Sequence, residues 1–285
     1  MNRAERLGAL RAELARMGVQ GFLIPRADEH LGEYVPRSAE RLAWLTGFTG
    51  SAGLAIVLPR QAAVFSDGRY TLQIRNQIDV AHWEPRHITE EPPAEWLAAH
   101  AEGLVIGYDP WLHSEPAIER LKRPGVTFRA LPANPIDAVW ADRPRAPEAP
   151  ARAHPLSYAG KPSVEKRSEA AAELRAAGED AVVLADAHSI AWLLNIRGGD
   201  LDHTPLALGF ALLFADGAVS LFMEPAKLDH DTRAHLGNAV AIAPRDAMPA
   251  ALVALKGKRV RIDREATPSW FTDWLRDAGT EIRAG

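Results

Sequence analysis

Hydrophobic and polar positions along the chain alternate between two spacings, one typical of amphipathic helices and one typical of strands. Leu7, Leu10 and Leu14 recur at helical spacing, and Gly21–Pro25 is an apolar run of strand length. Continued along the chain, the pattern predicts helices near 69–77, 93–100, 114–121, 163–178, 225–236, 246–255 and 268–278, and strands near 54–58, 62–66, 80–87, 104–107, 126–131, 181–185, 205–215, 239–243, 259–263 and 280–283. Helices and strands alternate, which is typical of an α/β layered fold.

One succession of predicted elements, a helix followed by a loop and a hairpin, occurs twice in the chain. Ala43–Gly68 predicts a short helix, a glycine-bearing loop and an apolar β-hairpin. Ser189–Met223 predicts the same three elements, with Asp186 capping the helix and the hairpin turning at Asp216-Gly217. An apolar strand precedes each of the two repeated segments, at Gly21–Pro25 and at Ala181–Ala185. The repeat predicts two domains of similar fold, each a mixed sheet flanked by helices, within the 285 residues.

A proline-rich stretch lies between the two copies. Seven prolines occur from Pro132 to Pro162, and proline both fixes φ and removes a hydrogen-bond donor. We therefore expect a stiff, extended connector whose apolar residues dock it onto a domain surface. The predicted organisation is a first domain over 1–133, a docked linker over 134–160 and a second domain over 161–285.

Composition and charge limit the classes of function. Apolar residues make up 47% and charged residues 25%, typical of a soluble globular protein, and the net charge of −4 does not suit a nucleic-acid partner. The absence of cysteine excludes disulfide and thiolate chemistry. The N-terminus lacks the apolar core of a signal peptide, and the longest apolar run, 205–215, is too short to cross a bilayer. We expect a cytoplasmic protein without a membrane partner.

The glycines of the first loop have two interpretations. Gly47, Gly50 and Gly53 resemble a phosphate-binding loop in composition, but such loops leave a strand and open a helix. Here the loop follows a helix and precedes a strand, so we interpret the three residues as glycines of a sharp turn. A GxSxG nucleophile motif is also absent. The residues by themselves contain no self-sufficient catalytic constellation.

The second loop, Asn195–Thr204, is longer and more polar than a sheet connection requires. Asp200, Asp202 and His203 are metal-ligand types, but three neighbours on one loop rarely converge on a metal. The structural alternative is a loop held by Asx turns and by an Arg197–Asp200 ion pair. We favour a loop presented to a neighbouring domain or subunit.

Other candidate residues also have a structural alternative. Asp67 and Gly68 predict a turn and a helix start, while Arg69 and Tyr70 also suit a surface groove. Trp44 and Trp192 occupy equivalent places in the two repeated segments, so both side chains are predicted to pack in a core. The histidines without a shared spacing are predicted at the surface, namely His82, His87, His100, His113, His154 and His188.

Several motifs resemble one family. Trp44–Gly53 followed by Ser66–Tyr70 resembles the first domain of the three-domain Xaa-Pro aminopeptidases (aminopeptidase P, peptidase family M24). The linker and second domain of that family are matched by Asn134–Trp140 with Asp142-Arg-Pro, by Tyr158-Ala-Gly, and by Ile190–Asp200 with Pro205. The resemblance covers almost the whole chain in the right order.

The resemblance implies two creatinase N-terminal-like domains followed by a C-terminal "pita-bread" catalytic domain. In the family, that domain binds two divalent metal ions, usually manganese, through two aspartates, a histidine and two glutamates, and removes the N-terminal residue that precedes a proline. This sequence stops at Gly285, where the resemblance places the start of that domain, so none of the five ligands maps onto it. We expect a fragment rather than a natural truncation, because the last predicted strand ends abruptly, and we expect it to be inactive alone.

The resemblance also implies a role for this half: to shape the active-site cleft, limit substrate access and fix subunit assembly. The loop Asn195–Thr204 would project towards the metal centre. Arg197 would contact substrate carbonyl or carboxylate groups, and Asp200 or His203 the free amine or the proline-side pocket. Arg69 and Tyr70 are further cleft candidates.

The implied partners are the protein's own catalytic domain, a peptide with proline at its second position, and a second subunit in a homodimer. An alternative from another class is a non-enzymatic protein-interaction module of the same fold. A third hypothesis is a small-ligand binding protein. No metal is expected to be held by this chain's own residues.

Overall fold

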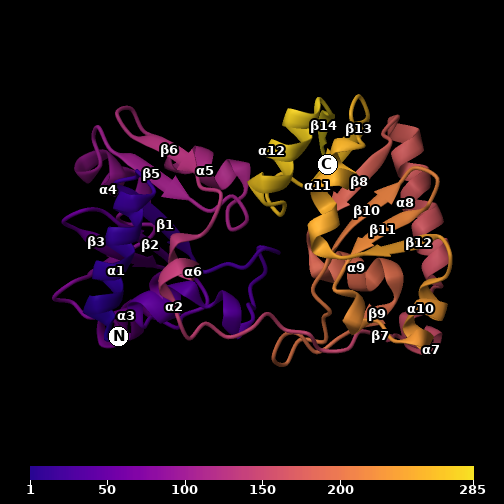
Figure 1. Ribbon diagram of the computed structural model, residues 1–285, viewed down its shortest axis with the longest axis horizontal. Helices are drawn as coiled ribbons and strands as arrows, with labels where there is room; N and C mark the ends of the chain where they lie inside the picture. The colour runs from indigo at the N-terminus through magenta and orange to yellow at the C-terminus, as the bar shows by residue number, and fades with distance from the viewer. The chain divides into compact units, whose positions relative to one another are not determined.

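The computed structural model describes residues 1–285 and divides into two compact units (Figure 1). Unit 1 comprises Met1–Asp28 and Glu33–Arg145, and unit 2 comprises Glu29–Gly32 and Ala146–Gly285. The stretch expected as a linker over 134–160 is therefore shared, its first part grouping with unit 1 and its remainder with unit 2. No helix is long and apolar enough to span a bilayer.

Unit 1 is a six-stranded mixed sheet with helices packed against it. Its strands are β1 (Gly21–Pro25), β2 (Leu54–Val57), β3 (Ala62–Ser66), β4 (Glu84–His87), β5 (Val105–Tyr108) and β6 (Thr127–Ala130). Its α-helices are α1 (Arg3–Arg16), α2 (Arg41–Thr46), α3 (Thr71–Gln77), α4 (Pro93–His100), α5 (Glu115–Leu121) and α6 (Pro135–Val139). The strand order is β4-β3-β2-β1-β5-β6, with β2 antiparallel to both neighbours and the other pairs parallel.

Unit 2 repeats this arrangement. Its main sheet contains β8 (Ala181–Leu184), β10 (Phe210–Phe214), β11 (Val219–Phe222), β12 (Val240–Ala243), β13 (Arg259–Ile262) and β14 (Glu281–Ala284), and a small second sheet pairs β7 (Arg152–Ala153) with β9 (Ile196–Arg197). Its α-helices are α7 (Leu156–Ala159), α8 (Ser163–Ala177), α9 (Ala187–Leu194), α10 (His230–Leu236), α11 (Met248–Val253) and α12 (Ser269–Ala278).

The two main sheets match strand for strand. In unit 2 the order is β12-β11-β10-β8-β13-β14, with β10 antiparallel to both neighbours and the other pairs parallel. Each central strand, β1 or β8, pairs on one side with the first strand of a hairpin, which runs antiparallel to it. On its other side it pairs with a parallel strand. The predicted fold class, two tandem α/β domains of similar fold with mixed sheets flanked by helices, is confirmed.

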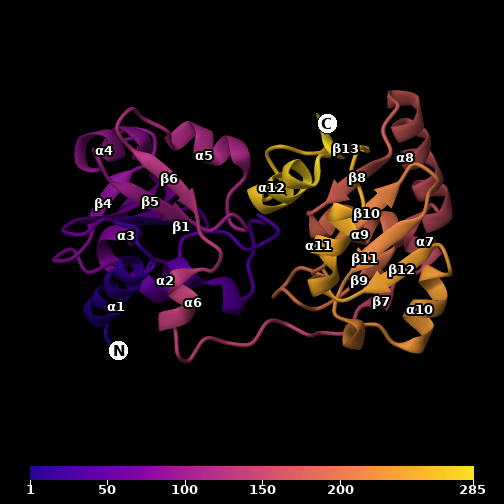
Figure 2. The ribbon, with the colours of Figure 1, turned by 45° about the horizontal axis from the view of Figure 1, so that its top comes forward.

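Alternation of side chains along β1 explains the layers of unit 1, because successive residues of a strand point to opposite faces. Phe22 and Ile24 belong to a core cluster with Leu7, while Leu23 belongs to a separate cluster with Trp96. Figure 2 shows α1, α2 and α6 on one face of this sheet and α4 and α5 on the other. Unit 1 therefore has an apolar core on each side of its sheet.

Several predicted elements differ from the observed ones; the strand expected over 80–87, for example, is confined to β4. The strand expected over 205–215 is confined to β10, because the preceding residues form a loop. The helix expected over 225–236 is a 3-10 turn, Pro225–Lys227, followed by α10, which Asp229 caps by accepting a hydrogen bond from the Thr232 N–H. An Asp cap starts a new helix at that point and so separates the two segments.

Candidate functional site

The loop between β9 and β10 carries three of the predicted site residues and folds back on itself as a narrow arm. The Gly198 N–H donates to the Pro205 carbonyl at 3.2 Å, and the Asp200 N–H to the Leu206 carbonyl at 3.0 Å. A β-bridge joins Leu201 and Thr204. We call residues 198–206 the arm. Because backbone hydrogen bonds close its base, the arm is a built structure rather than a loose connection.

Asp200 holds the base of the arm from inside. Its fully buried carboxylate pairs with the Lys227 ammonium at 2.5 Å, and it accepts hydrogen bonds from the Ala149 N–H at 3.0 Å and the Leu208 N–H at 2.6 Å. The Lys227 side chain is only 5% exposed and also donates to the Leu208 carbonyl. Within this chain the buried carboxylate fixes the loop, and its expected contact with a substrate amine stays a prediction.

The ion pair expected between Arg197 and Asp200 does not form. The Arg197 guanidinium donates to the carbonyls of Ala191, at 3.1 Å, and Ile196, at 2.8 Å. It is therefore tied to the last turn of α9 through the Ala191 carbonyl, which also accepts from the Asn195 N–H, and the helix dipole favours a cation at this end. Arg197 remains half-buried at the start of the arm.

The tip of the arm is exposed. Asp202 and His203 are both exposed, and His203 has φ of 60°, in the left-handed region that few residues other than glycine occupy. No group of three His, Cys, Asp or Glu side chains in residues 1–285 is arranged to hold a metal ion. Asp200, Asp202 and His203 do not form such a group.

Arg69 and Tyr70 lie in unit 1 beside the glycine loop. The Arg69 guanidinium pairs with Asp67 at 2.8 Å and lies over the Tyr70 ring, 5.2 Å from its centroid. The Tyr70 hydroxyl and the Ser51 hydroxyl are 2.9 Å apart, and this hydrogen bond lowers the pKa of Tyr70. The structure thus places both candidates in one cluster with Ser51, in which Arg69 is exposed and Tyr70 is half-buried.

The glycine loop itself is a packing turn. Gly47 ends α2 with φ of 86°. A Cβ at Gly50 would lie 2.3 Å from the Phe48 ring, and one at Gly53 would lie 2.8 Å from Leu42. Glycine is required here by the positive φ and by the close approach of a buried ring, which agrees with the turn interpretation.

A small cavity of about 140 Å³ lies where the parallel strands β3 and β4 end, next to α3. Asp67, Arg86 and His87 are among the residues that line it. The Arg86 guanidinium is already paired with Glu84 at 2.7 Å and with Glu91. These two carboxylates neutralise the guanidinium, and no spacing in the sequence marks the residues of this cavity as a group.

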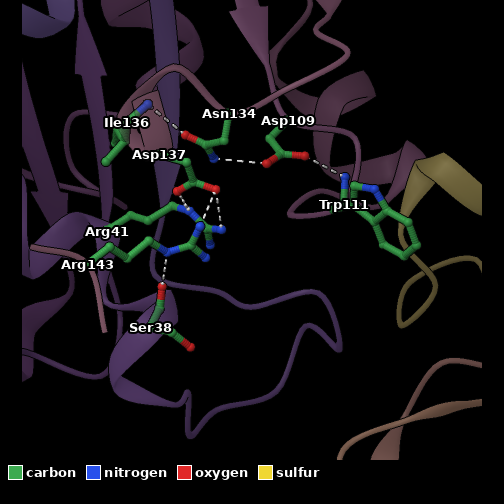
Figure 3. Close-up of polar contacts among 8 residues, drawn as sticks. All are labelled: Ser38, Arg41, Asp109, Trp111, Asn134, Ile136, Asp137 and Arg143. Carbon is green, nitrogen blue, oxygen red and sulfur yellow. Dashed lines mark hydrogen bonds and ion pairs between the residues drawn. The ribbon is translucent and has the colours of Figure 1, made fainter. Parts of the chain in front are cut away.

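The junction motif that follows β6 forms a polar network in unit 1 (Figure 3). Asp137 on α6 accepts from the Arg41 guanidinium at 2.7 and 3.0 Å and pairs with Arg143 at 2.6 Å. Arg143 also donates to the Ser38 carbonyl at 2.7 Å. These contacts connect the chain that follows β6 to the segment around α2. This part of the motif therefore anchors α6 on unit 1.

The other half of the network caps α6 (Figure 3). The Asn134 side chain accepts from the Ile136 N–H at 3.0 Å and donates to the Asp109 carboxylate at 2.9 Å. Asp109 also accepts from the Trp111 N–H at 2.9 Å. Nearby, Trp140 stacks on Trp44 with centroids 5.2 Å apart. The network and the stacked rings together hold the chain after β6 on unit 1.

Two placements predicted from the sequence are wrong. Trp44 is buried as expected, but Trp192 is 53% exposed, with the Lys166 ammonium 4.8 Å from its ring centroid. His113 is buried rather than superficial: its Nδ1 lies 3.1 Å from the Asp109 carbonyl, and burial lowers its pKa to about 4. Sequence spacing alone does not show which neighbours cover a side chain.

Comparison with protein families decides what the paired units are. Residues 6–132 and residues 142–284 each match a family model described as the creatinase/prolidase N-terminal domain. The chain belongs to this family. The two matches correspond to the two sheets, so creatinase/prolidase N-terminal domains occur here in tandem.

Individual relatives extend over both domains. A probable Xaa-Pro aminopeptidase P of Aspergillus flavus is 36% identical over 268 residues, which is 91% of this chain and 41% of the relative. The probable Xaa-Pro aminopeptidase P of Talaromyces stipitatus is 31% identical over 281 residues, 95% of this chain and 42% of the relative. The chain thus spans about two fifths of the length of these relatives.

A solved structure is also similar. The crystal structure of X-prolyl aminopeptidase from Caenorhabditis elegans matches all of this chain and 50% of its own, at 26% identity and a TM-score of 0.90. That protein is described as a cytosolic enzyme with a di-nuclear active site. The similarity covers both creatinase/prolidase N-terminal domains.

Proposed function

We propose that this chain is the N-terminal, non-catalytic half of a metal-dependent Xaa-Pro aminopeptidase, a hydrolase that removes the residue preceding a proline. The observation that carries the proposal is the continuous similarity to proteins named Xaa-Pro aminopeptidase P, over 91% of the chain in one case and 95% in another.

The proposal assigns the chemistry to a C-terminal catalytic domain, with two divalent metal ions, manganese by family resemblance, acting there as Lewis acids. The residues of this chain do not fit a metal, since no group of three potential ligands converges. This half would shape the cleft, limit access to peptides with proline second, and contribute to assembly of a homodimer. A cytoplasmic location is supported by the description of the C. elegans enzyme as cytosolic.

The arm is the element of unit 2 that we assign to the cleft. Its base is fixed by the buried Asp200–Lys227 pair, and its tip presents His203 in a defined backbone conformation. A rigid support of this kind positions a side chain for contact with a substrate at little entropic cost. Arg197 at the start of the arm would contact substrate carbonyl or carboxylate groups, and Arg69 and Tyr70 of unit 1 are further cleft candidates.

The test uses the complete gene product with Mn²⁺, comparing release of the first residue from Xaa-Pro and Xaa-Ala peptides. The proposal expects cleavage of the Xaa-Pro peptides alone; equal rates on both, or none on either, would contradict it. Within an active enzyme, Arg197→Ala and His203→Ala should each lower kcat/KM by about tenfold or more, and the matched control His230→Ala, an exposed histidine on α10, should not. An unchanged kcat/KM in both Arg197→Ala and His203→Ala would contradict the assignment of the arm, and of the residue that precedes it, to the cleft.

A further inference from the structure

The small cavity next to α3 in unit 1 has a polar lining that the proposed function does not use. Residues of β3, β4 and α3, and of the turn after β4, line it, and α3 and β4 lie side by side in Figure 2. Its volume is about 140 Å³. Because a cavity of roughly 150 Å³ is large enough to hold benzene, this one has room for a ligand of the size of a small amino acid.

Several charged groups around this cavity are neutralised within the chain. The Asp67 carboxylate pairs with the Arg69 guanidinium at 2.8 Å. The Arg86 guanidinium pairs with two carboxylates, that of Glu84 at 2.7 Å and that of Glu91. Two carboxylates on one guanidinium leave an excess of negative charge, and this excess opposes a ligand whose own net charge is negative.

Other polar groups of the lining have no partner within the chain. These are the Thr71 hydroxyl, the Arg75 guanidinium, the Glu90 carboxylate and Nε2 of His87. The His87 Nδ1 accepts from the Thr89 N–H at 3.3 Å and from the Glu90 N–H at 3.2 Å. The proton of the neutral imidazole therefore lies on Nε2, which is a donor. The lining thus offers one cation, one carboxylate, one hydroxyl and one imidazole N–H to a ligand.

A zwitterion matches this set of groups better than a simple anion does. A ligand carboxylate pairs with the Arg75 guanidinium, a ligand ammonium pairs with the Glu90 carboxylate, and the net charge of the ligand is zero. The buried Ile74 side chain and the half-buried Pro85 line the same cavity and suit an apolar group. We propose that this cavity binds a free α-amino acid with a small apolar side chain, such as L-valine. The inference concerns unit 1 alone and does not rest on the proposed function.

Isothermal titration calorimetry of the 285-residue chain tests the proposal with three matched probes. L-valine carries both charges, 3-methylbutanoate lacks the ammonium group, and isobutylamine lacks the carboxylate. The proposal expects saturable binding of L-valine with a Kd of about 1 mM or lower, which is within the range open to a ligand of this size. Each of the two analogues, which loses one charged contact, should bind about tenfold or more weakly than L-valine.

Variants locate the binding in this cavity. Arg75→Gln and Glu90→Gln each remove one charge at an exposed position, and each should raise the Kd for L-valine about tenfold or more. Arg60→Gln and Glu102→Gln are the matched controls, because both residues are exposed in unit 1 and neither lines the cavity. The controls should bind L-valine as the parent chain does.

Three outcomes would overturn the proposal. The first is the absence of saturable binding of L-valine to the parent chain. The second is binding of 3-methylbutanoate as tight as that of L-valine, or tighter binding of either probe by Glu90→Gln, because the cavity would then be a site for a simple anion. The third is an unchanged Kd for L-valine in both Arg75→Gln and Glu90→Gln, because the ligand would then lie elsewhere.

Discussion

At the scale of single residues, the Asp200–Lys227 pair has the largest expected effect on stability. Lys227→Met leaves the Asp200 carboxylate buried without its cation, which we expect to destabilise unit 2 by about 3–5 kcal/mol in urea unfolding. The double variant Asp200→Asn with Lys227→Met removes both charges and should recover part of this loss. As a control, Lys258→Met removes an exposed cation 3.6 Å from Asp180 and should change stability by less than about 1 kcal/mol. Equal losses from Lys227→Met and the control would refute the pair.

His113 makes a prediction about pH. Its pKa in the folded protein is lowered to about 4 from the ordinary value of 6.5. The unfolded chain therefore binds this proton first, so stability contributed by neutral His113 is complete above pH 6.5 and falls as the pH drops towards 4, by about 3 kcal/mol in all. His113→Gln should lose less stability than the parent chain between pH 7 and pH 4, whereas the exposed His188→Gln should not differ from it. Identical acid profiles for the parent chain and His113→Gln would show that the ring is not neutral and buried.

Residue placements missed from the sequence share one cause. The Arg197–Asp200 pair was expected because the residues are neighbours, but the cation that reaches Asp200 comes from Lys227, beyond the following hairpin. Trp192 is predicted in a core because its place in the repeat is equivalent to that of Trp44, but its ring is exposed and the Lys166 ammonium lies against it. Partners supplied by distant segments are not visible in local spacing.

At the scale of elements, local signals worked well. Asp186 is predicted as a cap, and its carboxylate accepts hydrogen bonds from the His188 and Ser189 N–H groups at the start of α9. The repeated segment also predicts the shared fold, because each copy contains a hairpin whose first strand pairs with the central strand of its sheet. Capping and hairpin formation depend on nearby residues, which explains why the sequence showed them. The arm was recognised as unusual, but its internal hydrogen bonds were not foreseen.

The anchoring of α6 makes a further prediction at this scale. Asp137→Ala removes the carboxylate that pairs with Arg41 and Arg143, and the Arg41 side chain is only 3% exposed. Leaving that guanidinium without its carboxylate should destabilise unit 1 by about 3 kcal/mol, measured by urea unfolding. Asp142→Ala, an exposed carboxylate on the same segment, is the matched control and should be nearly neutral. A comparable loss in both variants would argue against the network as an anchor.

At the scale of the whole molecule, the chain is a duplicated domain whose two copies have diverged in their loops. Both copies keep the same strand order. In the first copy the loop contains glycines that pack on Phe48. In the second copy the loop forms the arm, whose base is held by hydrogen bonds to Asp200. Conservation of the sheet with change in the loops is the usual way in which one fold acquires a second role.

The central claim is that this domain pair is a scaffold whose chemistry is supplied by a separate catalytic domain. The most direct measurement is the rate of Xaa-Pro peptide hydrolysis by the purified 285-residue chain and by the complete gene product, each with added Mn²⁺. The account predicts hydrolysis by the complete protein and no hydrolysis above background by the chain alone. Robust cleavage by the 285-residue chain would contradict it.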